Sequence, residues 1–353
     1  MENVLVSVII PFYNTDKALF DRCIKSVIAQ EYKNIECVVV DDGSDDEHSV
    51  FLDDYSKIDN RIKIFHKTNG GSGNTRNFGI DRSSGDYVFF LDSDDYISPY
   101  AVKNGVDLAI ENNADVVIGG LVHINSSENY EFKPSERKII LLKEQQDFND
   151  LVNHVCGYRN SRFNLENCSV GPSACSKLIK RKMLDEVSFV NDKFWDEDNL
   201  WCISLFSVCR RAVIADVNWY CYVMNPQSMI RRYAGDRSLE FQTRAKQEFG
   251  LVMEKWPDCL QAAYHSIFHG MLNYLRTDVA NPNNPKKSKE RYSDFENAIR
   301  FEEFEETIRN IDFDYEKRLI HKTVKNFIIH LLRKNKTKSS FDLLCLCIRK
   351  LRF

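Results

Sequence analysis

The sequence predicts an α/β fold in which helices cover both faces of a mostly parallel sheet, followed by a mainly helical C-terminal region. Short β-branched runs alternate with segments of helical periodicity through residue 119. Such alternation favours parallel strands joined by right-handed helical crossovers. After Asn225 and Pro226 the composition becomes helical and charged, so we expect one domain at 1–225 and a second at 226–353.

The first strand is expected at 6–11 and the second at 35–40, because both runs are apolar and β-branched. Residues 18–30, between them, carry apolar side chains at helical spacing. The same criteria predict further strands at 62–65, 87–91, 115–119, 174–179 and 212–223, and helices at 74–83, 99–112 and 197–209. Polar composition predicts a loop or edge hairpin at 125–137 and a loop at 281–289.

Composition is that of an ordinary globular enzyme, with 43% hydrophobic and 28% charged residues. We expect no signal peptide and no spanning helix, because the start lacks a basic segment and no apolar run approaches ~18 residues. Eleven cysteines at irregular spacing predict reduced thiols in a cytoplasmic protein and argue against a zinc site.

Charge is unevenly distributed along the chain. The tail, residues 317–353, holds eleven Lys or Arg and one acid, Asp342, for a net charge of +10; since the whole chain is −4, residues 1–316 carry −14. Apolar residues recur at helical spacing in the tail, which indicates a basic amphipathic segment suited to an anionic membrane surface. A helical appendage packed on the catalytic domain, with its charged face in water, explains the pattern equally well. The acidic body argues against nucleic acid as a partner.

Three aspartates, Asp92, Asp94 and Asp95, follow the strand expected at 87–91. The carboxyl edge of an open α/β sheet is where ligands bind. Crowded carboxylates repel one another unless a cation lies between them, and Mg²⁺ or Mn²⁺ accepts oxygen ligands while leaving room for phosphates. The cluster therefore predicts a metal and a phosphorylated substrate.

Two other strand tips are expected at the same edge. The first strand ends near Pro11 and Tyr13, and the second is followed by Asp41 and Asp42. An acidic side chain in that position can accept hydrogen bonds from a base or from ribose hydroxyls. A helix N-cap and turn is an equally good explanation of the segment Asp41–Ser44.

A glycine-rich loop, NGGSGNTRN, runs from Asn69 to Asn77 and opens the helix expected at 74–83. Asn69 and Gly70 are candidates for contact with a nucleotide, because such loops offer backbone N–H groups and a helix N-terminus to phosphate. Arg76 adds a charge-assisted contact. The loop alone is weak evidence, but the aspartates that follow it strengthen the interpretation.

Two further groups have competing explanations. Glu197 and Asp198 open the helix expected at 197–209, and spacing alone favours simple capping over a role as a proton acceptor. Arg231 and Arg232 follow the last expected strand, where they would either clamp a diphosphate or be solvated.

Five segments, in order, resemble glycosyltransferase family 2 enzymes of the GT-A fold over roughly the first 230 residues. They are VSVIIPFYN, VVVDDGSDD, NGGSGNTRNFGI, GDYVFFLDSDD and WDEDNLW. The resemblance implies that Asp42, with Asp41 beside it, binds the nucleotide base, and that Pro11 and Tyr13 line the same pocket. It implies that Arg76 faces the diphosphate, although Thr75 stands where alanine is usual.

The resemblance also implies that Asp92 and Asp94, with Ser93 between them, form a DxD motif in which Asp94 is the direct ligand of Mn²⁺ or Mg²⁺. It implies that Asp198 is the general base, with Glu197 beside it. The expected reaction is inverting transfer of a hexosyl or N-acetylhexosaminyl group from a nucleotide sugar, with a UDP-sugar as the expected donor. The expected acceptor is a hydroxyl of a glycan or lipid-linked glycan in capsule, O-antigen or other cell-surface polysaccharide synthesis.

The location expected from these features is cytoplasmic, peripheral on the inner face of the plasma membrane if the tail binds lipid. The alternative function is a sugar-phosphate nucleotidyltransferase, which also needs a glycine-rich loop and an aspartate-bound metal but releases pyrophosphate. The sequence does not fix the donor sugar, the base, the acceptor, the linkage or the oligomeric state.

Overall fold

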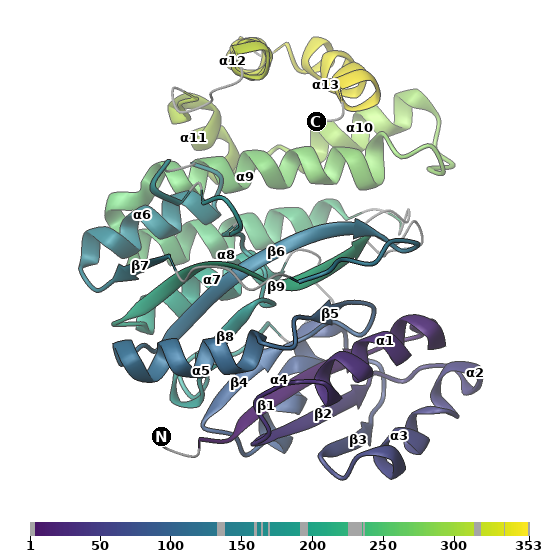
Figure 1. The fold of residues 1–353 in the computed structure, drawn as a ribbon. Helices are drawn as coiled ribbons and strands as arrows, with labels where there is room; N and C mark the ends of the chain where they lie inside the picture. The colour runs from purple at the N-terminus through teal and green to yellow at the C-terminus, as the bar shows by residue number, and fades with distance from the viewer. Residues whose placement is uncertain are drawn as a thin grey trace. The chain divides into compact units, whose positions relative to one another are not determined.

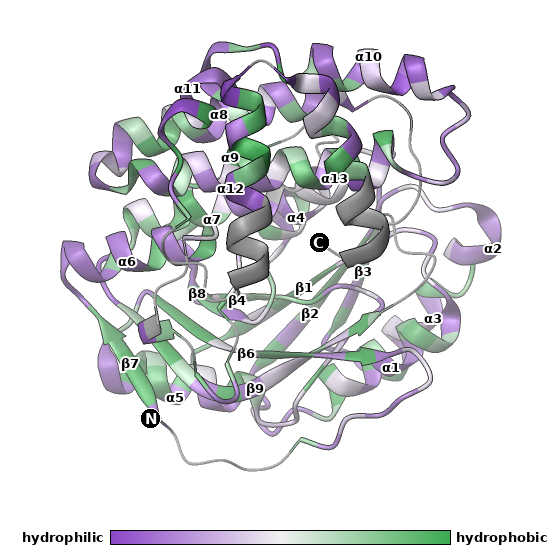
Figure 2. Cartoon of the chain, turned by 90° about the horizontal axis from the view of Figure 1, so that it is seen from above, coloured by the Kyte–Doolittle hydropathy of each residue, from purple (hydrophilic) through white to green (hydrophobic). Residues whose placement is uncertain are grey.

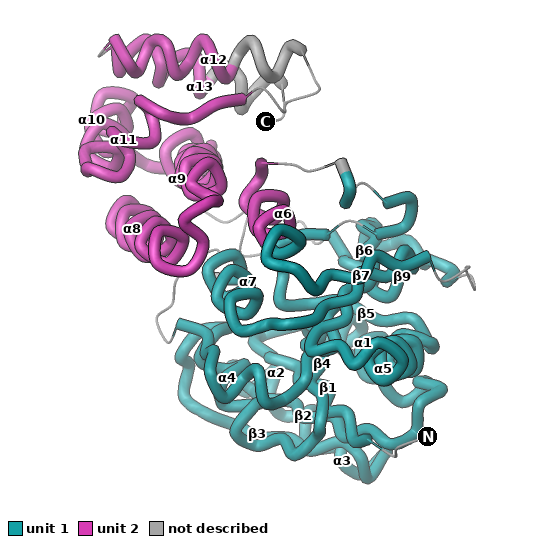
Figure 3. The backbone as a smooth tube through the Cα atoms, turned by 90° about the vertical axis from the view of Figure 1, so that its left-hand side faces the viewer, with its two compact units in different colours: residues 1–148, 162–225 teal, residues 149–161, 226–353 magenta. Residues whose placement is uncertain are grey.

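The computed structural model describes residues 4–132, 138–158, 161–163, 165–168, 170–190, 197–224, 235, 237–313, 319–334 and 336–351. The chain divides into two compact units (Figure 3). Unit 1 comprises residues 1–148 and 162–225, and unit 2 comprises residues 149–161 and 226–353. The division after residue 225 coincides with the expected one, whereas segment 149–161 belongs to unit 2.

Unit 1 is built on a sheet that has nine strands in the described part of the chain (Figure 1). The strands are β1 (Val6–Phe12), β2 (Ile35–Asp41), β3 (Ile62–His66), β4 (Tyr87–Phe90), β5 (Tyr96–Ile97), β6 (Val116–Asn125), β7 (Ile139–Leu142), β8 (Lys177–Lys180) and β9 (Ala212–Met224). Their order is β3-β2-β1-β4-β8-β6-β9-β5, and β7 pairs with β9. Strands β1 to β4, β6 and β9 point one way, and β5, β7 and β8 oppose them, so the sheet is mostly parallel as expected.

Helices cover both faces of this sheet. Figure 3 shows α4 on one side and α1 and α5 on the other. The helices that begin in unit 1 are α1 (Lys17–Ile28), α2 (Asp46–Ser49), α3 (Leu52–Ile58), α4 (Ser72–Arg82), α5 (Ala101–Asn112), α6 (Gln145–Val155) and α7 (Glu197–Val208). Because the central strands are covered twice, every residue of β2 is buried.

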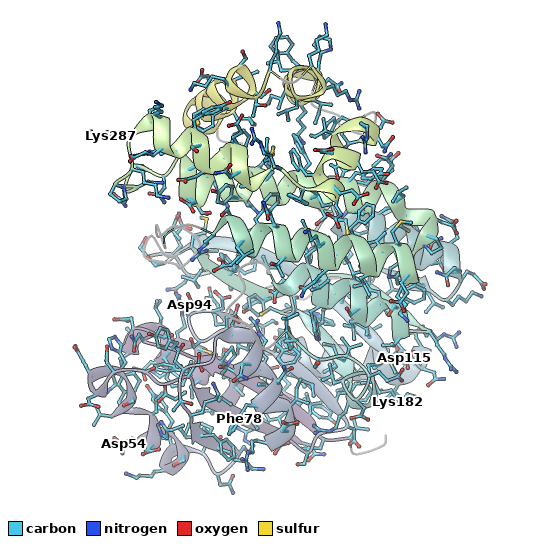
Figure 4. The ribbon with its side chains drawn as sticks, turned by 180° about the vertical axis from the view of Figure 1, so that it is seen from behind. Asp54, Phe78, Asp94, Asp115, Lys182 and Lys287 are labelled. Carbon is cyan, nitrogen blue, oxygen red and sulfur yellow. The ribbon has the colours of Figure 1, made fainter. Side chains whose placement is uncertain are left out.

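The register of the parallel strands sets the position of their tips. Strand β1 pairs with β2 from Val6 opposite Ile35 to Phe12 opposite Asp41, and β4 lies on the other side of β1. The carboxyl ends of β1 and β2 are therefore level. Asp94, labelled in Figure 4, follows β4 at this edge, whereas Asp115 and Lys182 lie away from it.

All the strands expected from the sequence are present, with shifted ends for some. The strand expected at 174–179 is shorter, and the one expected at 115–119 runs on to Asn125. Helices α2, α3 and α6 and strands β5 and β7 were not anticipated. Several of these elements are too short for periodicity to reveal them; β5 has only two residues and exists because it pairs with β9.

Unit 2 is mainly helical. Besides the end of α6 it contains α8 (Ser238–Lys255), α9 (Leu260–Tyr274), α10 (Ser288–Ala298), α11 (Glu302–Asn310), α12 (Leu319–Arg333) and α13 (Thr337–Leu351). Its core is rich in phenylalanine and tyrosine and includes Phe241, Phe268, Tyr274, Phe295, Phe304 and Phe313. Unit 2 thus has a hydrophobic core of its own.

Several described apolar residues of the tail belong to this core, whereas Phe327 is 53% exposed. Ile328, Ile329 and Leu332 of α12 and Phe341 and Leu344 of α13 are all buried in it. In Figure 2 the described parts of both helices alternate hydrophobic and hydrophilic residues. These tail residues therefore pack within unit 2, whereas the alternative to membrane binding that the sequence suggested was packing on the catalytic domain.

No helix in the described residues combines the length and the apolar character needed to cross a membrane. The cysteines whose side chains are described are free thiols, and all of them except Cys345 are buried.

Candidate active site

Hydrogen bonds link the loop that follows β1 to the loop that follows β2. The backbone N–H of Asn14 donates to Ser44 Oγ at 3.0 Å, and Asn14 Oδ1 accepts from the N–H of Asp45 at 3.0 Å. Pro11 is half-buried at the end of β1, and Tyr13 is 48% exposed. An exposed aromatic ring beside two strand tips is available to a ligand.

Asp41, the last residue of β2, is buried and engaged by two neighbours. Its carboxylate accepts from the N–H of Ser44 at 3.0 Å and contacts His66 Nδ1 at 2.8 Å. The hydrogen bond to Asp41 raises the pKa of His66. Asp41 therefore orders the loop after its own strand and the end of β3.

Asp42, also buried, holds the glycine-rich loop in place. Its Oδ1 accepts from Lys67 Nζ at 2.5 Å and from the N–H of Gly70 at 2.8 Å, and its Oδ2 accepts from the N–H of Gly71 at 2.9 Å. Asn69 Nδ2 donates to the Asp42 carbonyl at 2.9 Å. The amide of Gly70, a candidate for phosphate, is thus directed at Asp42 in this structure.

Gly43 is needed where the loop comes close to β2. It has a φ of +72°, and a Cβ at this position would lie 2.8 Å from the backbone nitrogen of Asn69. A side chain here would meet both strain and a backbone clash. Gly43 therefore allows the backbone after β2 to lie close to the glycine-rich loop.

Arg76 is 5% exposed and links two parts of the site. From α4 its Nη2 donates to Asp92 Oδ1 at 3.0 Å, and its Nη1 donates to Asp198 Oδ1 at 3.3 Å. Its guanidinium also lies over the ring of Phe189, 5.3 Å from the centroid. Thr75, in place of the usual alanine, is accommodated because its hydroxyl donates to the Gly71 carbonyl at 2.8 Å.

The turn after β4 presents Asp92, Ser93 and Asp94. Ser93 Oγ lies 2.6 Å from Thr15 Oγ1, which joins the turn to the loop after β1. Among described residues, no other side chain donates a hydrogen bond to the Asp94 carboxylate. Burial and the neighbouring charge of Asp92 raise the pKa of Asp94 to about 6.

Asp95, the last aspartate of the turn, is 1% exposed and faces the protein interior. Its Oδ2 accepts from the Tyr220 hydroxyl at 2.7 Å, and its Oδ1 accepts from the N–H of Val223 at 2.7 Å. The aspartates of one short segment therefore face different surroundings. Nothing in the alternation of β9 distinguishes Tyr220 from its neighbours, so the sequence gives no sign of its role.

Asp198 lies in the first turn of α7, beside an aromatic cluster. Phe189 stacks on Trp201 of the same helix, with ring centroids 4.4 Å apart. The backbone of Phe189 is held by Asn77 of α4, which donates to its carbonyl at 2.8 Å and accepts from its N–H at 2.9 Å. These contacts place the start of α7 next to Arg76. The sequence carried no signal for the roles of Asn77 and Phe189.

Other expected residues cannot be placed in the site. The side chain of Glu197 and all of Asp196 and Arg231 lie outside the described residues.

The carboxylates of the turn suit a hard cation that is bound partly by the protein and partly by a substrate. No group of three or more His, Cys, Asp or Glu in the described residues could hold a metal ion alone. Asp92 and Asp94 offer carboxylate oxygens, and Mg²⁺ or Mn²⁺ sites commonly combine one or two carboxylates with substrate phosphates. The mutual repulsion of the two carboxylates would be relieved by such an ion.

Comparison with known proteins identifies the family. The model of glycosyl transferase family 2 matches residues 7–187, more than half of the chain. The chain belongs to glycosyl transferase family 2. The resemblance drawn from the five segments is confirmed, and the protein is a glycosyltransferase, not a nucleotidyltransferase.

Curated relatives carry the same assignment. The chain is 31% identical over 229 residues to glycosyltransferase GlyG of Streptococcus pneumoniae serotype 4, covering 64% of this chain and 73% of GlyG. It is 28% identical over 296 residues to glycosyltransferase EpsJ of Bacillus subtilis strain 168, covering 81% of this chain and 82% of EpsJ.

Solved structures show the same fold. Residues 1–349 of S. aureus TarS, crystallised with UDP-GlcNAc, superpose with a TM-score of 0.66 at 17% identity, covering 98% of this chain and 91% of the TarS chain. A second crystal structure of the same TarS fragment superposes with a TM-score of 0.63. The GT-A-like architecture expected from the sequence is thus confirmed.

Proposed function

We propose that this family 2 glycosyltransferase transfers a sugar from a UDP-sugar to a glycan hydroxyl with inversion at the anomeric carbon. The observation that carries the proposal is Arg76, which contacts both Asp92 of the metal-binding turn and Asp198 of α7. One buried guanidinium thus connects the groups expected to handle the leaving diphosphate and the incoming hydroxyl. The TarS fragment was crystallised with UDP-GlcNAc and with UDP, which supports uracil as the base.

Asp198 accepts the proton of the acceptor hydroxyl as its oxygen forms a bond to the anomeric carbon. The bond from that carbon to the diphosphate oxygen breaks, and its electron pair leaves with the nucleoside diphosphate. Arg76 donates to the developing charge on the diphosphate. Asp94, with Asp92, would hold Mn²⁺ or Mg²⁺, which supplies additional charge stabilisation to the leaving group.

The nucleotide lies over the tips of β1 and β2 in this proposal. Tyr13 offers an exposed ring to the base, and Pro11 borders it. Asp41 and Asp42 lie directly beneath, where Asp42 also holds the loop that contains Asn69 and Gly70. Arg231, which lies outside the described residues, is proposed as a further contact of the diphosphate.

The acceptor is a glycan or a lipid-linked glycan of a bacterial cell-surface polysaccharide, such as capsule or O-antigen, and the enzyme works at the cytoplasmic face of the membrane. The relatives GlyG and EpsJ are bacterial glycosyltransferases, which supports a bacterial glycan as the acceptor. Membrane contact would be mainly electrostatic, because Ile328, Ile329, Leu332, Phe341 and Leu344 of the tail are buried in unit 2, although Phe327 is 53% exposed. Lys334 and Lys336 remain exposed for it.

The first experiment screens UDP-, GDP- and dTDP-sugars for slow hydrolysis in the presence of Mn²⁺. We expect a UDP-sugar to be hydrolysed with release of UDP. Release of pyrophosphate, or hydrolysis of GDP- or dTDP-sugars alone, would contradict the proposal.

The second experiment tests the base. Asp198→Asn should retain UDP binding in calorimetry while turnover falls by ~10² to 10⁴, the usual contribution of a general base. Asp185→Asn, an exposed aspartate in unit 1, is the control and should leave turnover unchanged. Near-full activity of Asp198→Asn would show that the base lies elsewhere.

The membrane contact is tested by flotation with vesicles that contain anionic lipid. Truncating the chain at Arg318 would remove buried residues of unit 2, so charge variants are the sharper test. Lys334→Gln with Lys336→Gln should weaken vesicle binding by roughly 30-fold, since each charge near an anionic surface contributes ~1 kcal/mol. Equal flotation of the variant and the unmodified chain would exclude these lysines as the contact.

A further inference from the structure

A buried hydrogen-bond network behind the aspartate turn joins β4 to β9. Tyr220 is fully buried, and its hydroxyl donates to Asp95 Oδ2 at 2.7 Å. The same hydroxyl accepts from the N–H of Asp92 at 3.1 Å. The other oxygen of Asp95 accepts from the N–H of Val223 at 2.7 Å.

The network holds both ends of the turn. Tyr220 contacts the backbone of Asp92, the first residue, and the side chain of Asp95, the last. Within the turn, the N–H of Asp95 donates to the Asp92 carbonyl at 3.1 Å. Asp94 lies between these two fixed points, so the positions of the Asp92 and Asp94 carboxylates depend on a hydroxyl 125 residues away in the chain.

The network counteracts electrostatic repulsion between the carboxylates of the turn. The carboxylates of Asp92, Asp94 and Asp95 repel one another, which favours opening of the turn when no cation is present. Asp95 is withdrawn from the edge by its two hydrogen bonds, which leaves Asp92 and Asp94 toward the ligand side. Mutation of groups that orient metal ligands in this way commonly lowers metal affinity by about 10- to 100-fold.

We propose that Tyr220 and Asp95 are positioning residues that hold Asp92 and Asp94 in the geometry that binds the divalent cation. The inference rests on the proposed function, because it takes Asp92 and Asp94 as the metal-binding pair. Tyr220 and Asp95 act through these two residues and do not themselves contact the ion or the substrate.

The test measures Mn²⁺ binding to the full chain with saturating UDP, by the electron paramagnetic resonance signal of free Mn²⁺. Tyr220→Phe removes one hydroxyl and keeps the ring. We expect the dissociation constant of Mn²⁺ to rise about tenfold. Thermal unfolding without Mn²⁺ and UDP should show that the variant is folded at the assay temperature.

Tyr55→Phe is the matched control. Tyr55 is buried in unit 1, and its hydroxyl donates to Asp21, so the variant also loses one hydrogen bond between a tyrosine and an aspartate. Neither residue contacts the turn, and Mn²⁺ binding should change by less than about twofold. Unchanged Mn²⁺ binding in Tyr220→Phe, or equal weakening in both variants, would overturn the inference.

Asp95→Asn is the second variant, for use if Tyr220→Phe does not fold. The amide keeps an oxygen for Val223 but replaces one acceptor with an NH₂ donor, so the tyrosine hydroxyl can no longer donate there. Mn²⁺ binding should again weaken by about tenfold, and unmodified binding would overturn the inference. If the wild-type chain itself binds no Mn²⁺ with UDP, the metal site of the proposed function fails, and this inference fails with it.

Discussion

At the scale of single residues, the site depends on side chains whose partners lie far away in sequence. Arg76 and Asp198 are 122 positions apart, yet their side chains are in hydrogen-bond contact. The guanidinium is almost fully buried and meets two carboxylates and an aromatic face. A planar group with several donors can serve all three contacts at once, whereas an ammonium cannot.

Arg76→Lys should therefore impair catalysis although it preserves the charge. We expect turnover of the UDP-sugar to fall by about 10², the usual effect of losing one preorganised donor at a developing charge. Steady-state kinetics with the donor found in the screen provides the measurement. Arg82→Lys, at the exposed end of the same helix, should retain full turnover. Turnover of Arg76→Lys within threefold of wild type would contradict this reading of the site.

At the scale of secondary-structure elements, α4 must pack closely on β1 to deliver Arg76. Gly79 allows this approach, because a Cβ at this position would lie 2.4 Å from Ile9 Cγ2. Ile9 is fully buried in β1, so it has little room to move. The close packing of α4 on β1, and with it the position of Arg76, thus depends on the lack of a side chain at Gly79.

Gly79→Ala should displace α4 and lower the free energy of unfolding by about 1–3 kcal/mol, as expected for overpacking. Urea unfolding measures the loss, and turnover should also fall because Arg76 moves with the helix. Gly250→Ala in α8 is the control, since nothing lies within 4 Å of a Cβ there. That variant should be neutral or slightly more stable, given the higher helix propensity of alanine. Equal effects of the two substitutions would refute the packing argument.

Glu36 joins three strands and the end of α4 on the side opposite the site. It accepts from Ser7 Oγ at 2.7 Å, from the N–H of Ser84 at 2.5 Å and from Lys63 Nζ at 2.6 Å. Burial by itself would raise the pKa of Glu36, but the hydrogen bonds from Lys63, Ser84 and Ser7 outweigh it and lower the pKa from 4.5 to about 2. The ionised form is therefore the one that stabilises the fold.

Glu36→Gln should lower the free energy of unfolding by about 2 kcal/mol at pH 7, the typical contribution of hydrogen bonds to a charged group. The folded pKa lies below the unfolded one, so the contribution is fully present above pH 4.5 and is lost as the pH falls toward 2. Urea unfolding at several pH values should show the variant and wild type converging over that interval. Glu47→Gln, at an exposed position, should differ little from wild type at any pH. A difference in the free energy of unfolding between Glu36→Gln and wild type that stays constant down to pH 2 would contradict the lowered pKa of Glu36.

At the scale of the whole molecule, the tail is part of the folded structure of unit 2. Ile329 of α12 is buried among the phenylalanines of the core, whereas Phe327, two residues earlier, is 53% exposed. Arg333 at the end of α12 donates from Nε to the Ile308 carbonyl at 2.6 Å, which ties the tail to α11. The basic tail is thus held in place by both apolar and polar contacts.

Ile329→Ala should lower the stability of unit 2 by about 2–5 kcal/mol, as for other large-to-small substitutions in a core. Phe327→Ala should change it by no more than about 0.5 kcal/mol, because the ring is exposed. Differential scanning calorimetry of the full chain would reveal the loss in the transition of unit 2. If the two variants unfold alike, α12 does not pack as described.

Sequence patterns were sufficient to predict the alternation of strands and helices in unit 1. They also predicted the sheet edge that carries Asp41, Asp42, Asp92 and Asp94. Both follow from local information, since periodicity reports burial and parallel strands bring their carboxyl ends to one side. The order of five motifs was sufficient to indicate the family, which the family model then confirmed.

Contacts between these groups follow from tertiary packing and could not be predicted from sequence patterns. The contacts of Arg76 with Asp198, of Asp95 with Tyr220 and of Asn77 with Phe189 join residues more than 100 positions apart. Sequence periodicity describes one element at a time and carries no information on such pairs. For the same reason, the amphipathic pattern of the tail predicted an apolar face but not its partner, which proved to be the phenylalanine-rich core of unit 2.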